Sequence, residues 1–281
     1  MTDFSAYKIK EWNDPDSVRN YARRDTIAPS PAELDFYTKY LKQIKEKIDA
    51  PRLLVLGATP ELRDLGLNLG FAVTAVDINP EMIKLADKSL TVKNRKKEEV
   101  ILGDWLEVSL PNGSFDAVLG DVALNNVTAE SLPRLLEKMA GWLKPGGLVL
   151  VRNIVLPADV KEISRLADDL RLWREGKMAF REFYFRFRFG HCYPDCYEEK
   201  SRIIDAGKEY QWLDRLYQDG VFNPEEYDQL NLRRSVILHT VLPIDEFLKI
   251  TAKYFTPVEA AAEVEEKFGF YPVKMFGLQK G

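Results

Sequence analysis

Gly57 and Asp77 are the residues whose types and spacing first suggest chemistry. Gly57 directly follows the aliphatic run Leu53–Leu56, and Asp77 ends a second aliphatic run twenty residues later. At this spacing, a carboxylate after the second strand of an α/β sheet reaches the ribose hydroxyls of a nucleotide held at the turn after the first strand. A carboxylate accepts hydrogen bonds from both hydroxyls of one ribose. The pair therefore predicts a ligand that contains a ribose.

The turn itself, "GATPEL", argues against a dinucleotide. A pyrophosphate needs free backbone N–H groups at the start of the following helix. Pro60 has no N–H, and Glu61 would place a carboxylate beside the phosphate charges. Neither residue disfavours a nucleoside with a cationic, phosphate-free tail, and S-adenosylmethionine is such a ligand. Close helix–strand packing is the alternative reason for Gly57, but it does not explain Asp104 and Asp121 at later strand ends.

Short aliphatic runs alternate with helical stretches from residue 53 onward, which is typical of βαβ units. Near-continuous aliphatic runs fit strands that are buried on both faces of a parallel sheet. We therefore predict an α/β fold with a doubly wound, mostly parallel, seven-stranded Rossmann-like sheet. The predicted strands are Leu53–Gly57, Ala72–Ile78, Val100–Asp104, Phe115–Gly120, Leu148–Ile154, Val258–Val264 and Tyr271–Leu278. The carboxyl ends of parallel strands share one rim, where Gly57 and the aspartates would meet.

The chain divides into three predicted parts. Residues 1–50 form an N-terminal arm and a helix, which begins at the capping box Ser30-Pro31-Ala32-Glu33. Residues 51–157 and 236–281 form the Rossmann-like domain, which would bind the ligand. Residues 158–235 interrupt this domain after the fifth strand and form a mainly helical cap or substrate segment.

The predicted cap contains an aromatic stretch, Phe180–Phe189, that fits helix spacing and strand alternation about equally. Most of it is expected to form the core of the cap. We also expect the cap to pack over the rim of the sheet as a lid, with Phe183 and Phe187 walling a substrate pocket and excluding water. Three residues of the arm are expected to complete this lid: Trp12, Tyr21 and Arg24. A dimer interface is the alternative role for the cap.

Five short motifs follow one another in the first half of the chain. They are "LLVLGATPEL", "AVDINPEMI", "VILGDW", "SFDAVLGDVALNNV" and "LKPGGLVLV". As a set, they resemble the motifs of the class I S-adenosylmethionine-dependent methyltransferases. The first motif is similar to that of a bacterial branch in which a G-x-T-P-E turn replaces the usual glycines. The resemblance implies a Rossmann-like methyltransferase with S-adenosylmethionine as its cofactor.

The resemblance also implies roles for residues after the first two strands. Gly57, Ala58 and Thr59 would line the methionyl and ribose parts of the cofactor. Asp77 would accept hydrogen bonds from the ribose hydroxyls, and Ile78 would pack on the adenine. These five residues are therefore expected to bind the cofactor.

Later motifs supply three more expected cofactor contacts. Asp104 matches the residue that accepts a hydrogen bond from the adenine amino group. Trp105 lies beside it and is expected to contact the cofactor, although an aromatic residue at this place is as often part of the core or of the rim of the sheet. Asp121 matches the position that faces the methionine end and the substrate, and it is the candidate catalytic base for a protonated acceptor. Asn125 and Asn126 are predicted to cap the next helix rather than to contact substrate.

Charge and composition narrow the expected partners. A net charge of −4 and a pI near 5.5 disfavour nucleic acid, so a small-molecule acceptor is expected, and a protein acceptor stays open. The N-terminal residues lack a signal-peptide pattern, and no apolar run reaches the ~20 residues of a membrane span, so we expect a cytoplasmic protein without membrane contact. The spacing of His191, Cys192 and Cys196 matches no recognised zinc site, and no metal is predicted.

Two other functions stay open, together with the oligomeric state. A nicotinamide-dependent oxidoreductase is built on a similar sheet, although Pro60 and Glu61 count against it. A methyltransferase-like scaffold would bind partners without catalysis. A homodimer is compatible with each of these functions.

Overall fold

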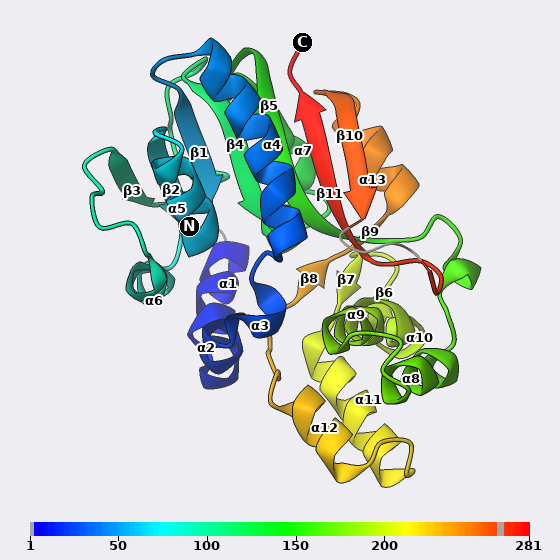
Figure 1. Ribbon diagram of the computed structural model, residues 1–281. Helices are drawn as coiled ribbons and strands as arrows, with labels where there is room; N and C mark the ends of the chain where they lie inside the picture. The colour runs from blue at the N-terminus through cyan, green and yellow to red at the C-terminus, as the bar shows by residue number, and fades with distance from the viewer. Residues whose placement is uncertain (1–2, 263–266) are drawn as a thin grey trace.

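A seven-stranded sheet forms the centre of the protein in the computed structural model (Figure 1), which describes residues 3–262 and 267–281. The strands are β1 (Arg52–Leu56), β2 (Ala72–Asp77), β3 (Glu98–Leu102), β4 (Phe115–Asp121), β5 (Leu143–Leu156), β10 (Thr256–Ala262) and β11 (Val273–Gln279). Their order is β3-β2-β1-β4-β5-β11-β10, and a short further strand, β9 (Leu242–Pro243), pairs with the end of β5. In this path β11 is the one strand that runs opposite to the other six, so the sheet is mostly parallel. The predicted α/β fold class is therefore confirmed.

Helices cover both faces of the sheet, because alternate residues of β1 belong to different cores. Leu53 and Val55 pack with α4 (Pro31–Lys47) and α5 (Pro60–Asn68). Leu54 and Leu56 pack with α7 (Leu132–Trp142) and α13 (Ile244–Thr251) on the opposite face. α6 (Pro80–Ser89) lies next to α5 and is tied to it by an ion pair between Arg63 and Asp87. The predicted capping box at the start of α4 is present.

The two edge strands differ from the prediction. Val100 and Leu102 in β3 are 36% and 60% exposed, so the prediction of a strand buried on both faces is wrong here. β3 is the last strand of the sheet, and the face that carries Val100 and Leu102 is left uncovered there. The predicted strand Val258–Val264 corresponds to β10, and its last two residues lie outside the described residues.

Three short helices precede α4 and form a segment that we call the arm. They are α1 (Asp3–Asn13), α2 (Pro15–Ala22) and α3 (Arg24–Ile27). Asp14 caps α2 by accepting from the N–H groups of Asp16 and Ser17. The arm lies at the carboxyl ends of the parallel strands, at the lower left in Figure 1.

The insertion, residues 158–235, lies at the same end of the sheet (Figure 1). Its helices are α8 (Leu166–Arg174), α9 (Phe180–Arg186), α10 (Tyr193–Cys196), α11 (Ala206–Gln218) and α12 (Pro224–Asn231), with a one-turn 3-10 helix at Val160–Glu162. A π-helical turn, Phe187–His191, continues α9, so the aromatic stretch is helical rather than extended. Two short strands, β6 (Tyr197–Glu198) and β7 (Ile203–Ile204), form a small sheet with β8 (His239–Thr240).

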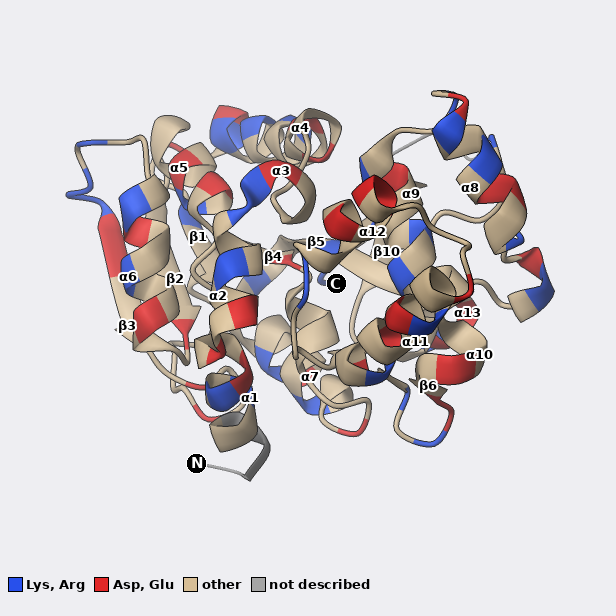
Figure 2. Ribbon diagram, turned by 90° about the horizontal axis from the view of Figure 1, so that it is seen from below, with Lys and Arg blue, Asp and Glu red and all other residues tan. Residues whose placement is uncertain are grey.

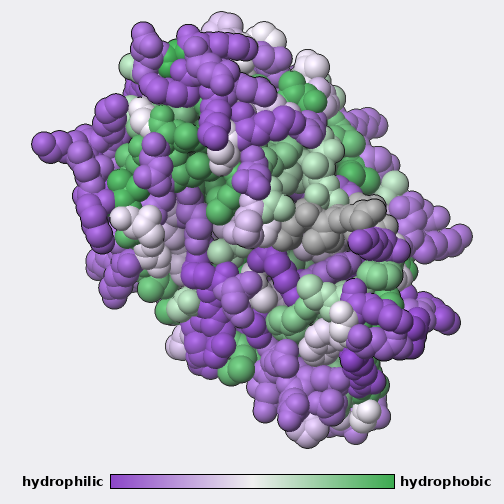
Figure 3. Space-filling view, in the orientation of Figure 1, coloured by the Kyte–Doolittle hydropathy of each residue, from purple (hydrophilic) through white to green (hydrophobic). Residues whose placement is uncertain are grey.

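The arm and the insertion flank the ends of β4 and β5. Figure 2, seen from below, shows α1–α3 on one side and α9, α11 and α12 on the other. The insertion has an aromatic core of its own, which includes Phe183, Phe187 and Phe222. On the face shown in Figure 3, hydrophilic side chains predominate over both segments. The fold therefore places two covers over the rim where the predicted site lies.

Candidate functional site

The turn after β1 requires glycine at position 57. Gly57 has a φ of +94°, a backbone conformation that residues with a side chain rarely adopt. A Cβ at this position would come no closer than 3.8 Å to Trp105 and 3.9 Å to Asp77, so close packing is not the reason for the glycine. Gly66 has that role instead, because a Cβ there would lie 2.5 Å from Leu53. Glycine is therefore needed here for the backbone conformation of the turn, which lies beside Asp77.

Asp77 is fixed at the end of β2 by the backbone. Its Oδ2 accepts from the N–H of Ala58 at 2.9 Å, and its Oδ1 accepts from the N–H of Asn79 at 2.8 Å. Each carboxylate oxygen keeps a second lone pair for a ligand hydroxyl. Burial raises the pKa of Asp77 to about 6, although the backbone N–H groups and Arg63 act in the opposite direction. The carboxylate is therefore oriented and largely ionised at neutral pH.

Asp104 and Trp105 lie at the end of β3. Asp104 accepts from the N–H of Leu106 at 2.8 Å through its Oδ1, which holds the carboxylate at the turn. The indole Nε1 of Trp105 donates to the carbonyl of Val76 at 2.7 Å, so the ring lies across the ends of β2 and β3. Trp105 is therefore anchored to the rim, as one reading of the sequence had it, and it also lines the cavity described below.

Asp121 belongs to a buried ion-pair network at the end of β4. Its Oδ1 lies 2.5 Å from Nε of Arg152, whose Nη1 lies 2.9 Å from Oε2 of Glu33. The next residue, Val122, has a φ of +56°, which is a strained conformation for a β-branched side chain. Oδ1 of Asp121 is already engaged by the buried guanidinium of Arg152. The contacts of Asp121 thus favour a positioning role over that of a base.

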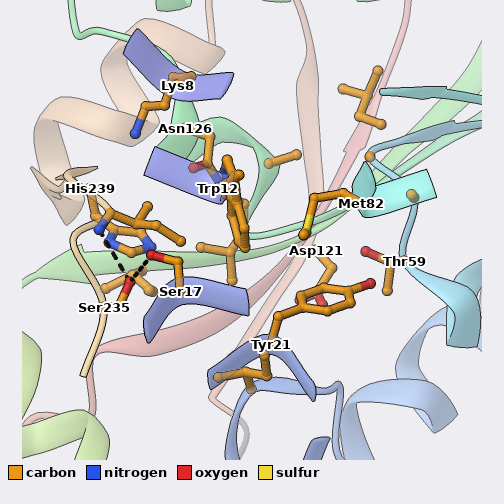
Figure 4. A pocket seen from close by; sticks show the side chains of 18 of the residues that line it. Lys8, Trp12, Ser17, Tyr21, Thr59, Met82, Asp121, Asn126, Ser235 and His239 are labelled. Carbon is orange, nitrogen blue, oxygen red and sulfur yellow. Dashed lines mark hydrogen bonds between the residues drawn. The ribbon is translucent and has the colours of Figure 1, made fainter. Parts of the chain in front are cut away.

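One cavity of about 180 Å³ brings the predicted residues together, whereas a water molecule needs only ~10–15 Å³ by the same measure. All the cofactor residues predicted from the sequence line it: Gly57, Ala58, Thr59, Asp77, Ile78, Asp104, Trp105 and Asp121. Figure 4 shows that the cavity has two ends, with Trp12 between them. One end contains Thr59 and Met82, and we call it the Asp77 lobe because Asp77 binds the N–H of Ala58, next to Thr59. The other end contains Lys8, Ser235 and His239, with Phe189 packed against His239, and we call it the His239 lobe.

The arm closes the Asp77 lobe. Trp12, Tyr21 and Arg24 all line the cavity, so the predicted position of these residues is confirmed. Arg24 donates from Nε to Glu61 Oε1 at 3.0 Å and from Nη2 to Glu61 Oε2, which ties α3 to the start of α5. The ring of Tyr21 packs edge-on against Trp12, and burial raises its pKa to about 12. Glu61, which disfavours a pyrophosphate, is therefore the point where the arm is attached.

The insertion closes the His239 lobe with a different helix face from the one predicted. Phe185 and Phe189 line the cavity and stack on each other at 6.0 Å. Phe183 and Phe187 do not line it but stack on Trp173 at 4.5 Å and on Trp212 at 4.8 Å, respectively. The prediction that Phe183 and Phe187 wall the pocket is wrong, because side chains four apart share one face of a helix and theirs faces the core of the insertion.

Asn125 connects the sheet with the segment that follows the insertion. Its side-chain nitrogen donates to the carbonyls of Ile154 at 2.8 Å and Thr240 at 2.7 Å, and its Oδ1 accepts from the N–H of Ile154. Asn126 donates to the carbonyl of Val122. Neither residue caps α7, so that prediction is wrong, since both amides are used by backbone groups at the ends of β4 and β5.

The one histidine of the insertion and its cysteines are buried in the core of that segment. His191 Nε2 lies 3.0 Å from Oδ2 of Asp169, and the Cys192 thiol donates to the carbonyl of Arg188. No cluster of three or more metal-ligating side chains occurs in residues 3–262 and 267–281. Over the same residues, no helix combines the length and the apolar character that crossing a membrane would require.

The sequence reasoning missed several residues of the His239 lobe, above all Lys8, Arg188, Ser235 and His239, which line the cavity. They come from the first helix, from the insertion and from the segment after it. No motif marks them, and the only local signal was that the chain contains two histidines. Long-range contacts such as that of Lys8 Nζ with the carbonyl of Leu238, 230 residues away, bring them together.

Comparison with known proteins agrees with this geometry. Residues 56–151, which include the turn after β1 and the ends of β2, β3 and β4, match a family model described as a methyltransferase domain. This part of the chain is therefore similar to a methyltransferase domain. The predicted methyltransferase is thus confirmed at the level of this domain, and the branch with a G-x-T-P-E first motif stays a prediction.

Individual relatives of the methyltransferase domain are distant. A demethylmenaquinone methyltransferase of Listeria monocytogenes serotype 4a (strain HCC23) is 26% identical over 161 residues, which are 55% of this chain and 61% of that protein. The chain thus spans less than two thirds of the length of this curated relative. A Burkholderia thailandensis 1,6-didemethyltoxoflavin-N1-methyltransferase, solved with 1,6-didemethyltoxoflavin and S-adenosylhomocysteine, is 15% identical with a TM-score of 0.52, covering 98% of this chain and 86% of its own.

A third similar protein has a name from another enzyme class. It is a structure from Rhodobacter sphaeroides that was provisionally named a Zn-dependent alcohol dehydrogenase. It is 16% identical, has a TM-score of 0.57, and the match covers 100% of this chain and 99% of that one. At such identities both structural matches show the fold alone.

Proposed function

We propose that this protein is an S-adenosylmethionine-dependent methyltransferase that acts on a small molecule. The observation that carries the proposal is the cavity, since the predicted contacts at the ends of β1, β2, β3 and β4 all line it. The match of residues 56–151 to a methyltransferase domain supports the same reaction class. The two methyltransferases named above, which carry small molecules in their names, support the acceptor class.

The Asp77 lobe has the chemistry that the cofactor requires. Asp77 would accept from the ribose hydroxyls, Ile78 and Trp105 would hold the adenine, and Asp104 would accept from the adenine amino group. Gly57 leaves room at the turn because it has no side chain. When bound, the sulfonium of the cofactor supplies an activated methyl group. The protein's own tasks are to align the donor with the acceptor and to exclude water.

The covers over the cavity favour a small acceptor. The arm is fastened to α5 through Arg24 and Glu61 and to the insertion through Arg233 and Asp25. Arg233 is buried in this contact, so the junction between arm and insertion is packed. An acceptor site beneath two such covers suits a metabolite better than a nucleic acid or a folded protein. We accordingly propose that residues 158–235 act as a substrate cap.

A nicotinamide-dependent oxidoreductase is the second candidate, because the Rhodobacter sphaeroides structure, which has a similar fold, was provisionally named a Zn-dependent alcohol dehydrogenase. Pro60 without an N–H and Glu61 beside it disfavour the pyrophosphate that this cofactor contains. The third candidate is a scaffold that binds without turnover. A homodimer and a cytoplasmic location stay predictions, and sedimentation velocity tests the first.

Release of S-adenosylhomocysteine separates these candidates. The purified protein is incubated with S-adenosylmethionine and a panel of metabolites, and the product is quantified by mass spectrometry. The proposal predicts release that depends on one class of acceptor. Binding of S-adenosylmethionine without release from any acceptor would favour the scaffold, and reduction of NAD⁺ in a parallel panel would favour the oxidoreductase.

A further inference from the structure

The His239 lobe is the part of the cavity that the cofactor contacts do not use. Its walls are aromatic, since Phe189 and Phe185 stack on each other and the edge of His239 packs against Phe189 with the ring centroids 5.5 Å apart. Its polar groups are the Ser17 and Ser235 hydroxyls, 3.3 Å apart, the imidazole, and two cations that are each paired with a carboxylate, Lys8 and Arg188. Such a lobe suits a flat, ring-bearing molecule with one polar group at the reacting end.

His239 is held in place from two sides. It lies in β8, where it pairs with Ile204 of β7 in the insertion. The next residue, Thr240, accepts a hydrogen bond from Asn125, which also binds the end of β5. Asn125 follows Asp121 on the turn after β4, and it is Asp121 that the resemblance assigns to the methyl end of the cofactor. His239 and Asp121 line the same cavity, so the imidazole borders the space in which an acceptor would meet the methyl group.

Nearby charges keep the imidazole in its neutral form. Burial lowers the pKa of His239 well below its usual value, and the cations of Arg188 in the insertion and Lys8 in α1 lower it further. Each cation has a carboxylate beside it, Glu209 at 3.1 Å from Arg188 and Glu11 at 2.9 Å from Lys8. A hydrogen bond with the backbone of Ile237 occupies one ring nitrogen and leaves the other as an acceptor.

We propose that His239 is the general base for methyl transfer to an aryl hydroxyl group, a proposal that rests on the proposed methyltransferase function. The hydroxyl oxygen forms a bond to the methyl carbon while the carbon–sulfur bond breaks, and its electron pair stays on sulfur to give S-adenosylhomocysteine. The hydroxyl proton passes to the free ring nitrogen of His239 and then to solvent. No oxidant or reductant is needed.

The surroundings select this acceptor class over two others. An amine acceptor in its ammonium form would be repelled by Lys8 and Arg188. An aliphatic alcohol is a weaker acid than an aryl hydroxyl, and a base as weak as His239 removes the more acidic proton more readily. Asp121, the base that the sequence suggested, is already paired with Arg152.

Nuclear magnetic resonance tests the site without knowledge of the natural acceptor, because the chain has only two histidines. Protein with ¹⁵N-labelled imidazoles is saturated with S-adenosylhomocysteine and titrated with 2-naphthol as the probe. We expect the ring nitrogens of His239 to shift and those of His191, which packs on Asp169 and does not line the cavity, to stay unchanged. The His239→Asn and His191→Asn variants assign the two signals. Absence of a His239 shift, or equal shifts of both, overturns the proposal.

Methyl transfer from radiolabelled S-adenosylmethionine to 2-naphthol and to 2-naphthalenemethylamine, which is an ammonium at neutral pH, tests the chemistry. The hydroxyl probe should be methylated in preference to the amine, and His239→Asn should lower kcat about 10²-fold or more. Added imidazole should restore part of the rate in His239→Ala, which a purely structural role would not predict. Preference for the amine, no transfer to 2-naphthol, or an unchanged kcat in His239→Asn would refute the assignment. Calorimetric binding of S-adenosylmethionine is measured in parallel, so that loss of cofactor binding identifies a failure of the proposed function instead.

Discussion

Replacing Asp77 with alanine should weaken S-adenosylmethionine binding by about 10²- to 10⁴-fold. The carboxylate is held by the N–H groups of Ala58 and Asn79 at 2.9 and 2.8 Å, with one lone pair of each oxygen left for the ribose. Loss of two hydrogen bonds to a charged group costs about 1.5–3 kcal/mol each, or about 3–6 kcal/mol together. Each 1.4 kcal/mol is about a tenfold change in Kd.

Isothermal titration calorimetry measures this effect, with circular dichroism to show that the variant is folded. Asp87→Ala is a matched control, because Asp87 is a carboxylate on the neighbouring helix that pairs with Arg63 and does not line the cavity. The control should bind the cofactor as the unmodified protein does. A folded Asp77→Ala protein whose Kd lies within twofold of the original would refute the ribose assignment.

The same carboxylate makes cofactor binding depend on pH. Asp77 must be ionised to accept from both hydroxyls, and burial raises its pKa to about 6. Affinity should therefore fall as pH drops through about 6, by about tenfold at pH 5. The free energy of unfolding without cofactor changes in the opposite sense. The pKa of Asp77 in the folded protein lies above its usual value of 3.8, so the folded protein holds this proton more tightly than the unfolded chain does. Ionisation of Asp77 therefore lowers the stability of the fold as pH rises from about 4 to 6. Calorimetric titrations at pH 5 and pH 7 check the affinity, and Asp77→Ala should remove most of the difference.

Three further predictions concern the walls of the cavity. Asp104→Ala should weaken cofactor binding less than the loss of the ribose carboxylate, since only the adenine amino group loses a partner, and calorimetry gives the order. Phe185→Ala should raise KM or lower turnover with cofactor affinity nearly intact. Phe183→Ala should instead lower the free energy of unfolding by about 3–5 kcal/mol, because the Phe183 ring is completely buried in the core of the insertion. Arg24→Ala should speed cofactor dissociation about two- to fivefold in stopped-flow fluorescence, since a partly exposed ion pair contributes about 0.5–1 kcal/mol. Glu61→Gln should have the same effect, and an unchanged dissociation rate in both variants would show that the arm does not retain the cofactor.

Much of the Asp77 lobe could be predicted from the sequence because its signals are local. An aliphatic run followed by Gly57, and a second run ended by Asp77, mark strand ends wherever the rest of the chain lies. The parallel sheet then brings these ends to one rim by its topology. The arm could be placed near the rim from its aromatic residues and Arg24, although its contact with Glu61 could not be foreseen.

The His239 lobe could not be predicted because it depends on contacts between distant segments. Lys8 reaches the carbonyl of Leu238 across 230 positions, and Asn125 reaches Thr240 across 115. No short motif records either contact. The prediction chose Phe183 instead of Phe185 for a related reason. The sequence shows that aromatic side chains lie on more than one face of the helix. Only the packing of α9 against Trp173 and the sheet decides which of these faces lines the cavity.

Calorimetric titration of the unmodified protein with S-adenosylmethionine, and separately with NAD⁺, tests the central claim most directly. The eight residues at the ends of four strands should bind one S-adenosylmethionine per chain, with S-adenosylhomocysteine competing for the same site. Pro60 and Glu61 should prevent measurable binding of NAD⁺. Saturable binding of NAD⁺ together with no heat from S-adenosylmethionine would contradict the account, because the cavity would then hold the pyrophosphate that its turn is expected to reject.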